Sequence, residues 1–286
     1  MSGFEPGSLV RLAPGVQRLL APNPSLMTGP GTNTYLLGDP PLAVLDPGPL
    51  AAAHLERMQA AAPALAMILV THTHADHSAA AMRLAQLTGA RLIGRAAPAD
   101  PHHDRSFRPD VEPAPEARFE LPGMTLRAIA TPGHASNHVC YLIEEQGLLF
   151  SGDHILDGVT PVIMPPDGVM GDYLDSLADL RTRALRAIAP GHGRLLTDPL
   201  AVIDAIVAHR ARREAKVLRA LGRLRSAHLD ALLALVYDDV PPALHAMARC
   251  SLSAHLLKLQ QEGRCRHAGG QWSLTGTAAE STPVDG

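Results

Sequence analysis

The chain has 286 residues, of which 46% are hydrophobic and 19% are charged, and this composition excludes a disordered chain and a coiled coil. Aromatic residues make up only 3%, which argues against a sheet that stacks RNA bases on aromatic rings. The longest apolar run is too short to span a bilayer and the first residues carry no signal-like segment, so we expect a cytoplasmic protein with no membrane partner. Three widely spaced cysteines predict neither a disulfide framework nor a CxxC metal clamp.

The net charge of −3 conceals an asymmetry along the chain. Residues 1–204 carry a net charge of −7, residues 205–275 carry +6, and residues 276–286 carry −2. We therefore expect an acidic domain over 1–204, a basic module over 205–275 and a flexible tail over 276–286.

From residue 35 onward, short apolar runs alternate with helix-like segments, which predicts a mixed α/β domain rich in sheet. The predicted strands cover 35–37, 42–45, 66–70, 91–94, 124–130, 139–143 and 148–150, and the predicted helices 50–61, 78–87 and 173–188. Residues 96–115 are rich in Pro, Asp and His and are expected to form a surface loop.

The C-terminal part has the element order of a winged-helix module. Helices are predicted over 199–225, 229–236 and 243–261, followed by two short β-like runs at 264–267 and 271–274. The last helix offers only Arg249 and Lys258 as basic residues, so we do not expect DNA binding. A homodimer formed through this module is one arrangement that the pattern allows.

The segment Thr71–His77 reads THTHADH and directly follows the apolar run 66–70. In an extended segment, His72 and His74 point to the same side, and Asp76 and His77 lie just past the bend. Imidazole and carboxylate groups are the ligands that Zn²⁺ and related divalent ions accept. The segment therefore predicts a metal site at the end of a buried strand.

Three later segments repeat this placement of a candidate ligand after a strand-like run. They present His134 in Thr-Pro-Gly-His, Asp153 in Ser-Gly-Asp-His and His192 in Pro-Gly-His-Gly. Ligands at the ends of neighbouring strands can converge on one rim, and a carboxylate such as Asp153 can bridge two metal ions.

This order of motifs, HxHxDH followed by His, Asp and His, resembles that of the metallo-β-lactamase superfamily over roughly residues 29–193. The resemblance implies an αβ/βα sandwich with the metal site on one edge of its two sheets. It implies two zinc ions, with manganese or iron also compatible with these ligands. The first ion would be held by His72, His74 and His134 and the second by Asp76, His77 and His192, with Asp153 bridging.

The same resemblance implies a hydrolase that uses a metal-bridged hydroxide, with Asp76 orienting the water and moving its proton. Asp46 matches an early Asp-x-Gly segment and would orient a histidine ligand, the alternative being a turn-forming Asp. Aspartate rather than cysteine at position 153 argues against the common zinc β-lactamases. Only 38 residues separate Asp153 from His192, too few for the domain inserted there in one RNA-processing branch.

Segments along nearly the whole chain resemble the beta-lactamase-like protein 2 family. They are 29–35, 131–138, 151–156, 189–193, His209-Arg210 with Arg213-Glu214, and the C-terminal module. This resemblance implies a zinc-dependent endoribonuclease that cleaves single-stranded RNA. Thr73 and Ala75 replace bulkier, more polar residues expected in that family, which leaves substrate preference open.

Two other functions stay open. A thioesterase acting on acyl-CoA, acyl-carrier or glutathione thioesters would use the same motifs, and a non-catalytic metal-binding protein would keep metal without turnover. The shape and charge of the cleft near His138 and Arg105–Arg108 should discriminate between the thioesterase and the endoribonuclease. A narrow apolar channel favours acyl chains, and a wide basic groove favours RNA.

Several further residues carry individual expectations. His138 is expected to face the substrate as a catalytic residue, whereas His102 and His103 are expected to be solvated and Asn33 to hold a turn. His154 is expected either to donate a hydrogen bond near the metals or to pack in the core, and Cys140 and Cys250 are expected in the core. The basic residues of 210–225 are expected mostly to lie on a solvated helix that packs on the body.

Overall fold

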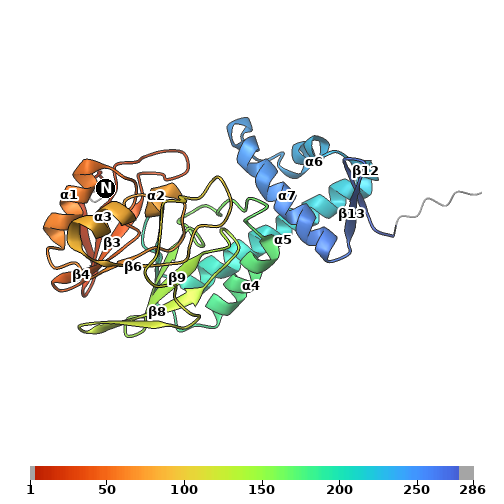
Figure 1. Ribbon diagram of the computed structural model, residues 1–286. Coiled ribbons are helices and arrows are strands. Elements are labelled where there is room, and N and C mark those ends of the chain that lie inside the picture. The colour runs from red at the N-terminus through yellow and green to blue at the C-terminus, as the bar shows by residue number, and fades with distance from the viewer. Residues whose placement is uncertain (1–3, 277–286) are drawn as a thin grey trace, which may run out of the picture.

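Two β-sheets packed face to face form the body of the molecule, which this computed structural model describes over residues 4–276 (Figure 1). The first sheet has the order β1-β2-β3-β4-β5-β6. Its strands are β1 (Leu9–Ala13), β2 (Val16–Leu20), β3 (Asn33–Gly38), β4 (Pro41–Leu45), β5 (Met67–Leu69) and β6 (Arg91–Ile93). The second has the order β11-β10-β9-β8-β7, with β7 (Arg118–Leu121), β8 (Met124–Ala130), β9 (Val139–Ile143), β10 (Leu148–Gly152) and β11 (Ala187–Pro190).

The pairing directions decide which strand ends meet. Strands β4, β5 and β6 run parallel, so their carboxyl ends lie on one edge of the first sheet. In the second sheet β8 and β10 are both antiparallel to β9, and β11 is parallel to β10. The carboxyl ends of β8, β10 and β11 therefore also share an edge.

Apolar side chains from the inner faces of both sheets form a continuous core. The rings of Tyr35 on β3 and Phe150 on β10 lie 4.8 Å apart between centroids and are almost completely buried. Leu45 and Leu126 belong to the same cluster and are fully buried. Each such side chain contributes roughly 1.5–3 kcal/mol through removal of apolar surface from water.

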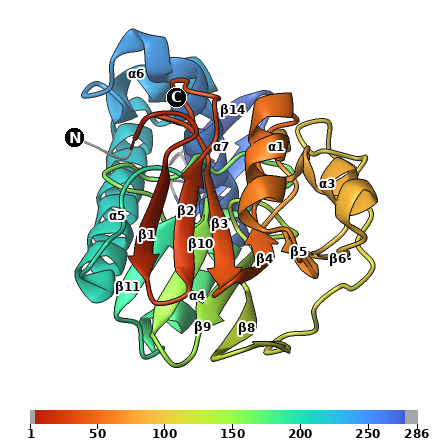
Figure 2. The same cartoon turned by 90° about the vertical axis from the view of Figure 1, so that its left-hand side faces the viewer.

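Helices cover the outer faces of the sandwich, as Figure 2 shows. Helices α1 (Ala52–Ala61), α2 (Ala75–Ser78) and α3 (Ala81–Thr88) follow strands of the first sheet, where Met58 and Leu84 pack against Ile68. Helices α4 (Met170–Arg181) and α5 (Pro199–Leu224) cover the second sheet, where Tyr173 and Ile203 join the cluster of Leu149. The layers have the helix-sheet-sheet-helix order of the expected αβ/βα sandwich.

The C-terminal module has the predicted helices and a small sheet. It contains the second half of α5, β12 (Ser226–Ala227), α6 (Leu229–Val236), a 3₁₀ turn (Pro242–Leu244), α7 (His245–Gln261), β13 (Cys265–Ala268) and β14 (Gln271–Leu274). Helix α5 begins at an N-cap, where the Asp198 carboxylate accepts a hydrogen bond from the backbone N–H of Ala201 at 3.1 Å. It then runs unbroken through the division predicted at 204/205. Its Ile206 packs with the sandwich and its Val217 with the module.

The structure differs from the sequence expectations in a few elements. The helix predicted over 173–188 ends at Arg181, because Ala187 and Ile188 pair with β10 as strand β11. Strands β1, β2, β7 and β12 were not predicted. Of the predicted tail, residues 277–286 lie outside the described part of the chain. Within residues 4–276, no helix has both the length and the apolar character that crossing a bilayer requires.

Candidate metal centre

The residues predicted as metal ligands all come from turns at the shared edge of the two sheets. Those of the first motif follow β5 and enter α2, and the other three follow β8, β10 and β11. Their side chains form three overlapping groups in which the candidate ligand atoms lie within 4.8 Å of one another. The groups are His72 with His74 and His134, His72 with His77 and Asp153, and Asp76 with His77 and His192.

In the first group, ring nitrogens face one another. Nδ1 of His74 lies 2.9 Å from Nε2 of His72 and 3.1 Å from Nε2 of His134. The other nitrogen of His134 donates to the backbone oxygen of Val162 at 2.8 Å, so its Nε2 has an unprotonated lone pair in the neutral ring. Converging imidazole lone pairs are the arrangement that a divalent cation stabilises.

Besides His72, the other two groups contain two imidazoles and two carboxylates, and we treat these four residues together as the second group: Asp76, His77, Asp153 and His192. Nε2 of His192 lies 3.2 Å from Asp76 and 3.3 Å from Asp153, and Nε2 of His77 lies 3.4 Å and 3.3 Å from the same two carboxylates. The other oxygen of Asp153 is 3.9 Å from Nε2 of His134. Asp153 thus lies between the two groups, where a bridging carboxylate is expected.

Hydrogen bonds outside the cluster fix the orientation of its rings. Asp46, fully buried after β4, accepts hydrogen bonds from the backbone N–H of Thr71 at 2.7 Å, from its hydroxyl at 2.8 Å and from Nδ1 of His77 at 2.9 Å. Nδ1 of His192 donates to the backbone oxygen of Gly31 at 3.2 Å. The expectation that Asp46 orients a histidine is confirmed for His77. The geometry leaves Nε2 of His77 and His192 directed at the carboxylates.

The backbone at Gly191 passes so close to the cluster that no side chain fits there. A Cβ at Gly191 would lie 2.6 Å from both Oδ1 of Asp153 and Cε1 of His77, closer than any side chain tolerates. Glycine at this position lets β11 deliver His192 to the centre.

Burial and neighbouring charges divide the histidines into two protonation classes. Burial lowers the pKa of His72 well below its ordinary value and that of His74 to about 3. Burial also lowers the pKa of His192, but Asp153 and Asp76 raise it by more, so that it lies at about 9. For His77 the same carboxylates outweigh burial and hold the pKa well above its ordinary value.

The donor set fits divalent metal ions. Nε2 of His77 and Oδ1 of Asp153 are buried and have no hydrogen-bond partner among the described residues, and both point into the cluster. Nitrogen and carboxylate donors with orphaned buried atoms suit divalent cations of the zinc, manganese or iron type.

A cavity of about 590 Å³ opens above the cluster and extends to the C-terminal module. His74, Asp76, His134, Asp153 and His192 line it at one end. Elsewhere its walls are mainly apolar, formed by Leu26, Met27, Ala75, Leu156, Val159, Pro161, Val162, Met164, Tyr237, Val240, Leu244, Met247 and Ala248. Leu26, Met27 and Val159 are also largely exposed, which gives the cavity an apolar rim.

The expectation that His138 faces the substrate is wrong. The residue directly precedes β9 and is fully buried, its Nδ1 is 2.9 Å from the Thr131 hydroxyl, and its ring stacks on that of His72 at 5.0 Å. It does not line the cavity. It packs behind a candidate ligand, so we describe it as a positioning residue. His154 packs behind it in turn, 5.6 Å from ring to ring.

Two further expectations are corrected. His103 is buried rather than solvated, because its ring lies between the Thr73 hydroxyl at 2.7 Å and the Asp167 carboxylate at 3.0 Å, and it lines the cavity. Asn33 does not hold a turn but begins β3, and its side chain donates to the backbone oxygens of Pro190 and Gly193, both at 2.9 Å. His102 is exposed, as expected.

The sequence did not predict the far wall of the cavity. Arg210 and Arg213 of α5 line it, although most of this helix's basic residues were expected in solvent, and both are buried. Arg105 and Arg108, expected near the cleft, do not line it. The only local signal was the helical spacing that puts positions 210 and 213 on one face.

Comparison with known proteins agrees with this geometry. Residues 27–192 match the family model described as the Metallo-beta-lactamase superfamily, and residues 229–272 match the Beta-lactamase associated winged helix domain. The C-terminal module is thus a winged helix.

Two curated relatives show the range of proteins that this chain resembles. The chain is 32% identical to the Beta-lactamase-like protein 2 homolog of Drosophila melanogaster, over 91% of this chain and 92% of that protein. It is 30% identical to the Atrochrysone carboxyl ACP thioesterase of Aspergillus fumigatus, over 75% of this chain and 67% of that protein.

A solved structure, that of a metallo-beta-lactamase family protein from Thermus thermophilus, shares the fold. Its TM-score is 0.75 at 22% identity, over 92% of this chain and 100% of that one. Motif order, site geometry and comparisons agree, and the chain belongs to the metallo-beta-lactamase superfamily.

Proposed function

We propose that this protein is a binuclear metal-dependent hydrolase of acyl thioesters. The observation that carries the proposal is the cavity of about 590 Å³, which joins the ligand cluster to largely apolar walls. An acyl chain would leave water along these walls while its thioester carbonyl lies at the cluster. The superfamily's members are generally hydrolases, which supports the reaction class.

Metal ions held by this donor set would supply Lewis acidity at the carbonyl oxygen and a water of lowered pKa. Asp76 is the ligand candidate with the most exposed side chain in the second group, at 29%, and lines the cavity. In this proposal its carboxylate would orient the attacking water and accept its proton. Hydrolysis joins the water oxygen to the acyl carbon, breaks the C–S bond and delivers the proton to the departing sulfur.

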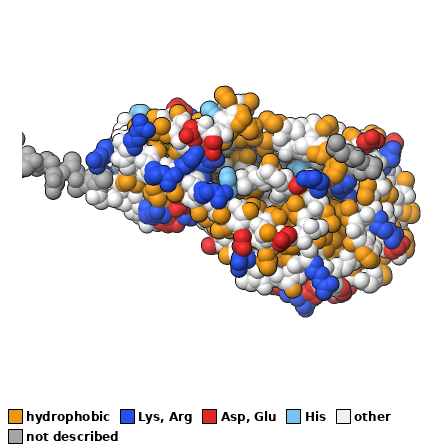
Figure 3. Space-filling view, turned by 180° about the vertical axis from the view of Figure 1, so that it is seen from behind, with side chains coloured by type: hydrophobic (Ala, Val, Ile, Leu, Met, Phe, Trp, Pro, Cys, Tyr) orange, Lys and Arg blue, Asp and Glu red, His pale blue; other side chains and the backbone are white. Residues whose placement is uncertain are grey.

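The cavity favours an acyl thioester over RNA. Among the described residues, the Lys and Arg side chains that line it are Arg210 and Arg213, against the carboxylates of Asp76, Asp100, Asp153 and Asp167. A phosphodiester backbone requires a continuous basic surface. On the face shown in Figure 3, basic side chains gather mainly over the C-terminal module and are interspersed with acidic and apolar ones.

Cleavage of single-stranded RNA is the second candidate. It is favoured by the relative named Beta-lactamase-like protein 2 homolog, which matches 91% of this chain, whereas the fungal thioesterase matches 75%. The chain's resemblance to the first family implies this activity.

The experiment compares both substrate classes on zinc-loaded protein. Acyl N-acetylcysteamine and acyl-CoA thioesters of increasing chain length are assayed for released thiol, and labelled single-stranded RNA for cleavage, with Asp76→Ala in parallel. We expect thioester hydrolysis that falls by about 100-fold or more in the variant, with RNA intact. Metal analysis of both proteins reports the number and identity of the ions.

The other outcomes are decisive. RNA cleavage that the variant loses, without thioester turnover, would replace the proposal by the second candidate. Stable metal binding with no turnover of either substrate would indicate a non-catalytic metal-binding protein.

A further inference from the structure

Arg210 is a buried cation in the wall of the cavity. It lies on α5, is 3% exposed and lines the cavity together with its helix neighbours His209 and Arg213. Its guanidinium donates to the backbone oxygen of Pro161 and lies 5.3 Å from the centroid of the Tyr173 ring. Its Nε is buried and has no hydrogen-bond partner among the described residues.

No carboxylate within residues 4–276 forms an ion pair with Arg210, although four line the same cavity. The Tyr173 phenol does not supply the missing charge, because burial raises its pKa to about 12 and keeps it neutral. Arg213 differs, since its guanidinium pairs with Asp239 at 2.7 Å. Arg210 is therefore the uncompensated cation of the cavity.

The charge of Arg210 acts on a neighbouring histidine and helps to keep it neutral. His255 on α7 is almost fully buried, and its pKa is lowered to about 3, first by burial and then by the charge of Arg210. A buried guanidinium without an anion is unfavourable unless something neutralises it. Its planar fork of N–H donors matches a carboxylate or a phosphate.

We propose that Arg210 is the anion-binding residue of this cavity and receives a carboxylate or phosphate group carried by the substrate. The inference rests on the proposed thioesterase function and names its substrate class, a thioester that bears an anionic group away from the reacting carbonyl. Ser251 lines the same wall and offers a hydroxyl donor to the same group. The anion has two chemical sources, a carboxylate on the acyl chain or a phosphate on the pantetheine arm.

Four substrates separate the two sources: glutaryl-pantetheine, pentanoyl-pantetheine, and the CoA thioester of each acyl group. If the carboxylate is bound, kcat/KM of the wild-type protein is higher for glutaryl than for pentanoyl on either carrier. If the phosphate is bound, it is higher for CoA than for pantetheine with either acyl group. We expect about a tenfold or greater preference along one of these axes. Equal kcat/KM for all four substrates overturns the proposal.

Substitution of Arg210 then tests whether this residue causes the substrate preference. In Arg210→Gln, kcat/KM should fall about tenfold or more for the preferred substrates and change less than about twofold for the others. Arg210→Lys keeps the charge but loses the fork of N–H donors, so its kcat/KM for the preferred substrates should lie between those of the wild type and Arg210→Gln. This variant also serves as the test if Arg210→Gln does not fold. Arg212→Gln is the matched control, because Arg212 is the exposed neighbour on the same helix and does not line the cavity. A purely structural Arg210 would lower activity on all four substrates equally.

A binding measurement separates failure of this inference from failure of the proposed function. Calorimetry of zinc-loaded protein with glutarate, pentanoate and inorganic phosphate needs no turnover. Anion binding that Arg210→Gln abolishes, in a protein that hydrolyses none of the thioesters, would keep the subsite and refute the thioesterase. Thioester hydrolysis with no Arg210-dependent discrimination would refute the subsite alone.

Discussion

At the scale of single residues, the second group of ligands depends on a carboxylate outside it. Asp46 accepts three hydrogen bonds, two from Thr71 and one from Nδ1 of His77, in a fully buried position. Asp46→Asn keeps the shape but turns an amide N–H₂ toward a group that already donates. We expect zinc affinity at the site that includes His77 to fall about 10- to 100-fold, measured by titration against a competing chelator.

The matched control for this substitution is Asp39→Asn. Asp39 is an exposed carboxylate whose side chain pairs with Arg11 at 3.2 Å on the surface. It should leave zinc affinity unchanged. Equal zinc affinity in wild type and Asp46→Asn would show that Asp46 has no influence on His77.

Protonation of the metal-free centre gives a second residue-scale prediction. Near neutral pH, His77 and His192 are protonated because their pKa values are raised, whereas His72 and His74 are neutral. Zinc must displace the protons on Nε2, so we expect full loading near pH 7 to release about two protons or more per chain. Calorimetry in buffers of different ionisation enthalpy measures the number, and a release below about one would contradict this distribution.

The same raised pKa fixes the sign of one contribution to stability. The folded-state pKa of His192, about 9, exceeds its ordinary value of 6.5. The unfolded chain therefore loses this proton first as pH rises. The contribution is complete below about pH 6.5 and is lost as pH rises through about 9, so the stabilisation that this group gives the metal-free protein declines across that interval.

The ligand candidates could be predicted from sequence because each follows an apolar run within a short motif. Their convergence requires only that neighbouring strands end at one edge. The environments of His138 and His103 could not be predicted in this way. Burial of His103 depends on Asp167, 64 residues later in the chain, and His138 faces inward at the end of a turn whose direction no local pattern specifies.

At the scale of elements, α5 couples the sandwich to the winged helix. Its first half packs with Ile203 and Ile206 against the second sheet, its second half packs with Val217 and Leu221 in the module, and Arg210 lies between. Strong helical periodicity made this helix predictable over nearly its full length. The strands that were missed are short, and β1 and β7 lie at the sheet edges, where few of their side chains are buried.

Interrupting α5 should therefore affect activity without removing metal. Ala211 is exposed in the middle of the helix, and Ala211→Pro removes a backbone hydrogen bond at a cost of about 3 kcal/mol. The proposed ligands all precede α5, so zinc content should stay the same. Thioester kcat/KM should fall about tenfold or more, because the cavity wall shifts relative to the centre.

Ala211→Gly is the control for helix propensity alone, with a cost of about 1 kcal/mol. It should keep most of the activity. If Ala211→Pro folds with unchanged kcat/KM, the C-terminal wall has no part in binding the substrate.

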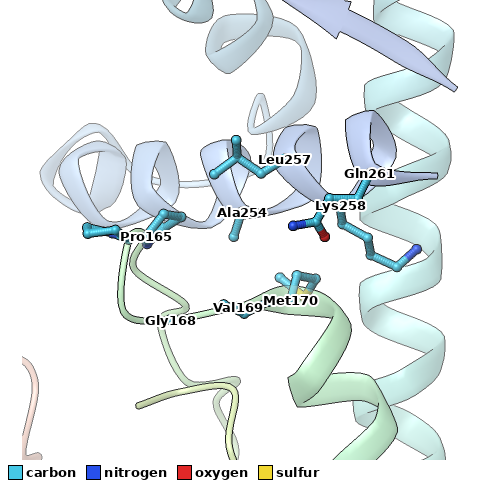
Figure 4. Close-up of a pocket in the computed structure, with 9 residues that line it drawn as sticks. Pro165, Gly168, Val169, Met170, Ala254, Leu257, Lys258 and Gln261 are labelled. Atoms are coloured by element: carbon cyan, nitrogen blue, oxygen red, sulfur yellow. The ribbon is translucent and has the colours of Figure 1, made fainter. Parts of the chain in front are cut away.

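At the scale of the whole molecule, the packing of both units predicts a single unfolding event. Figure 4 shows Val169 and Met170 at the start of α4 facing Ala254 and Lys258 of α7 across a cavity of about 200 Å³. Ala254 also belongs to the core cluster of the second sheet. Apolar contact at this seam and the unbroken α5 tie the stability of the module to that of the sandwich.

The single tryptophan of the chain, Trp272 on β14, tests this coupling. It is buried in the core of the module, whereas every proposed metal ligand lies in the sandwich. Zinc at a hundred times its Kd stabilises the folded state by about 2.7 kcal/mol. If the units unfold together, zinc raises the midpoint of urea denaturation measured by Trp272 fluorescence as much as it raises the midpoint measured by circular dichroism. An unchanged fluorescence midpoint alongside a shifted dichroism midpoint would show that the winged helix unfolds independently of the sandwich.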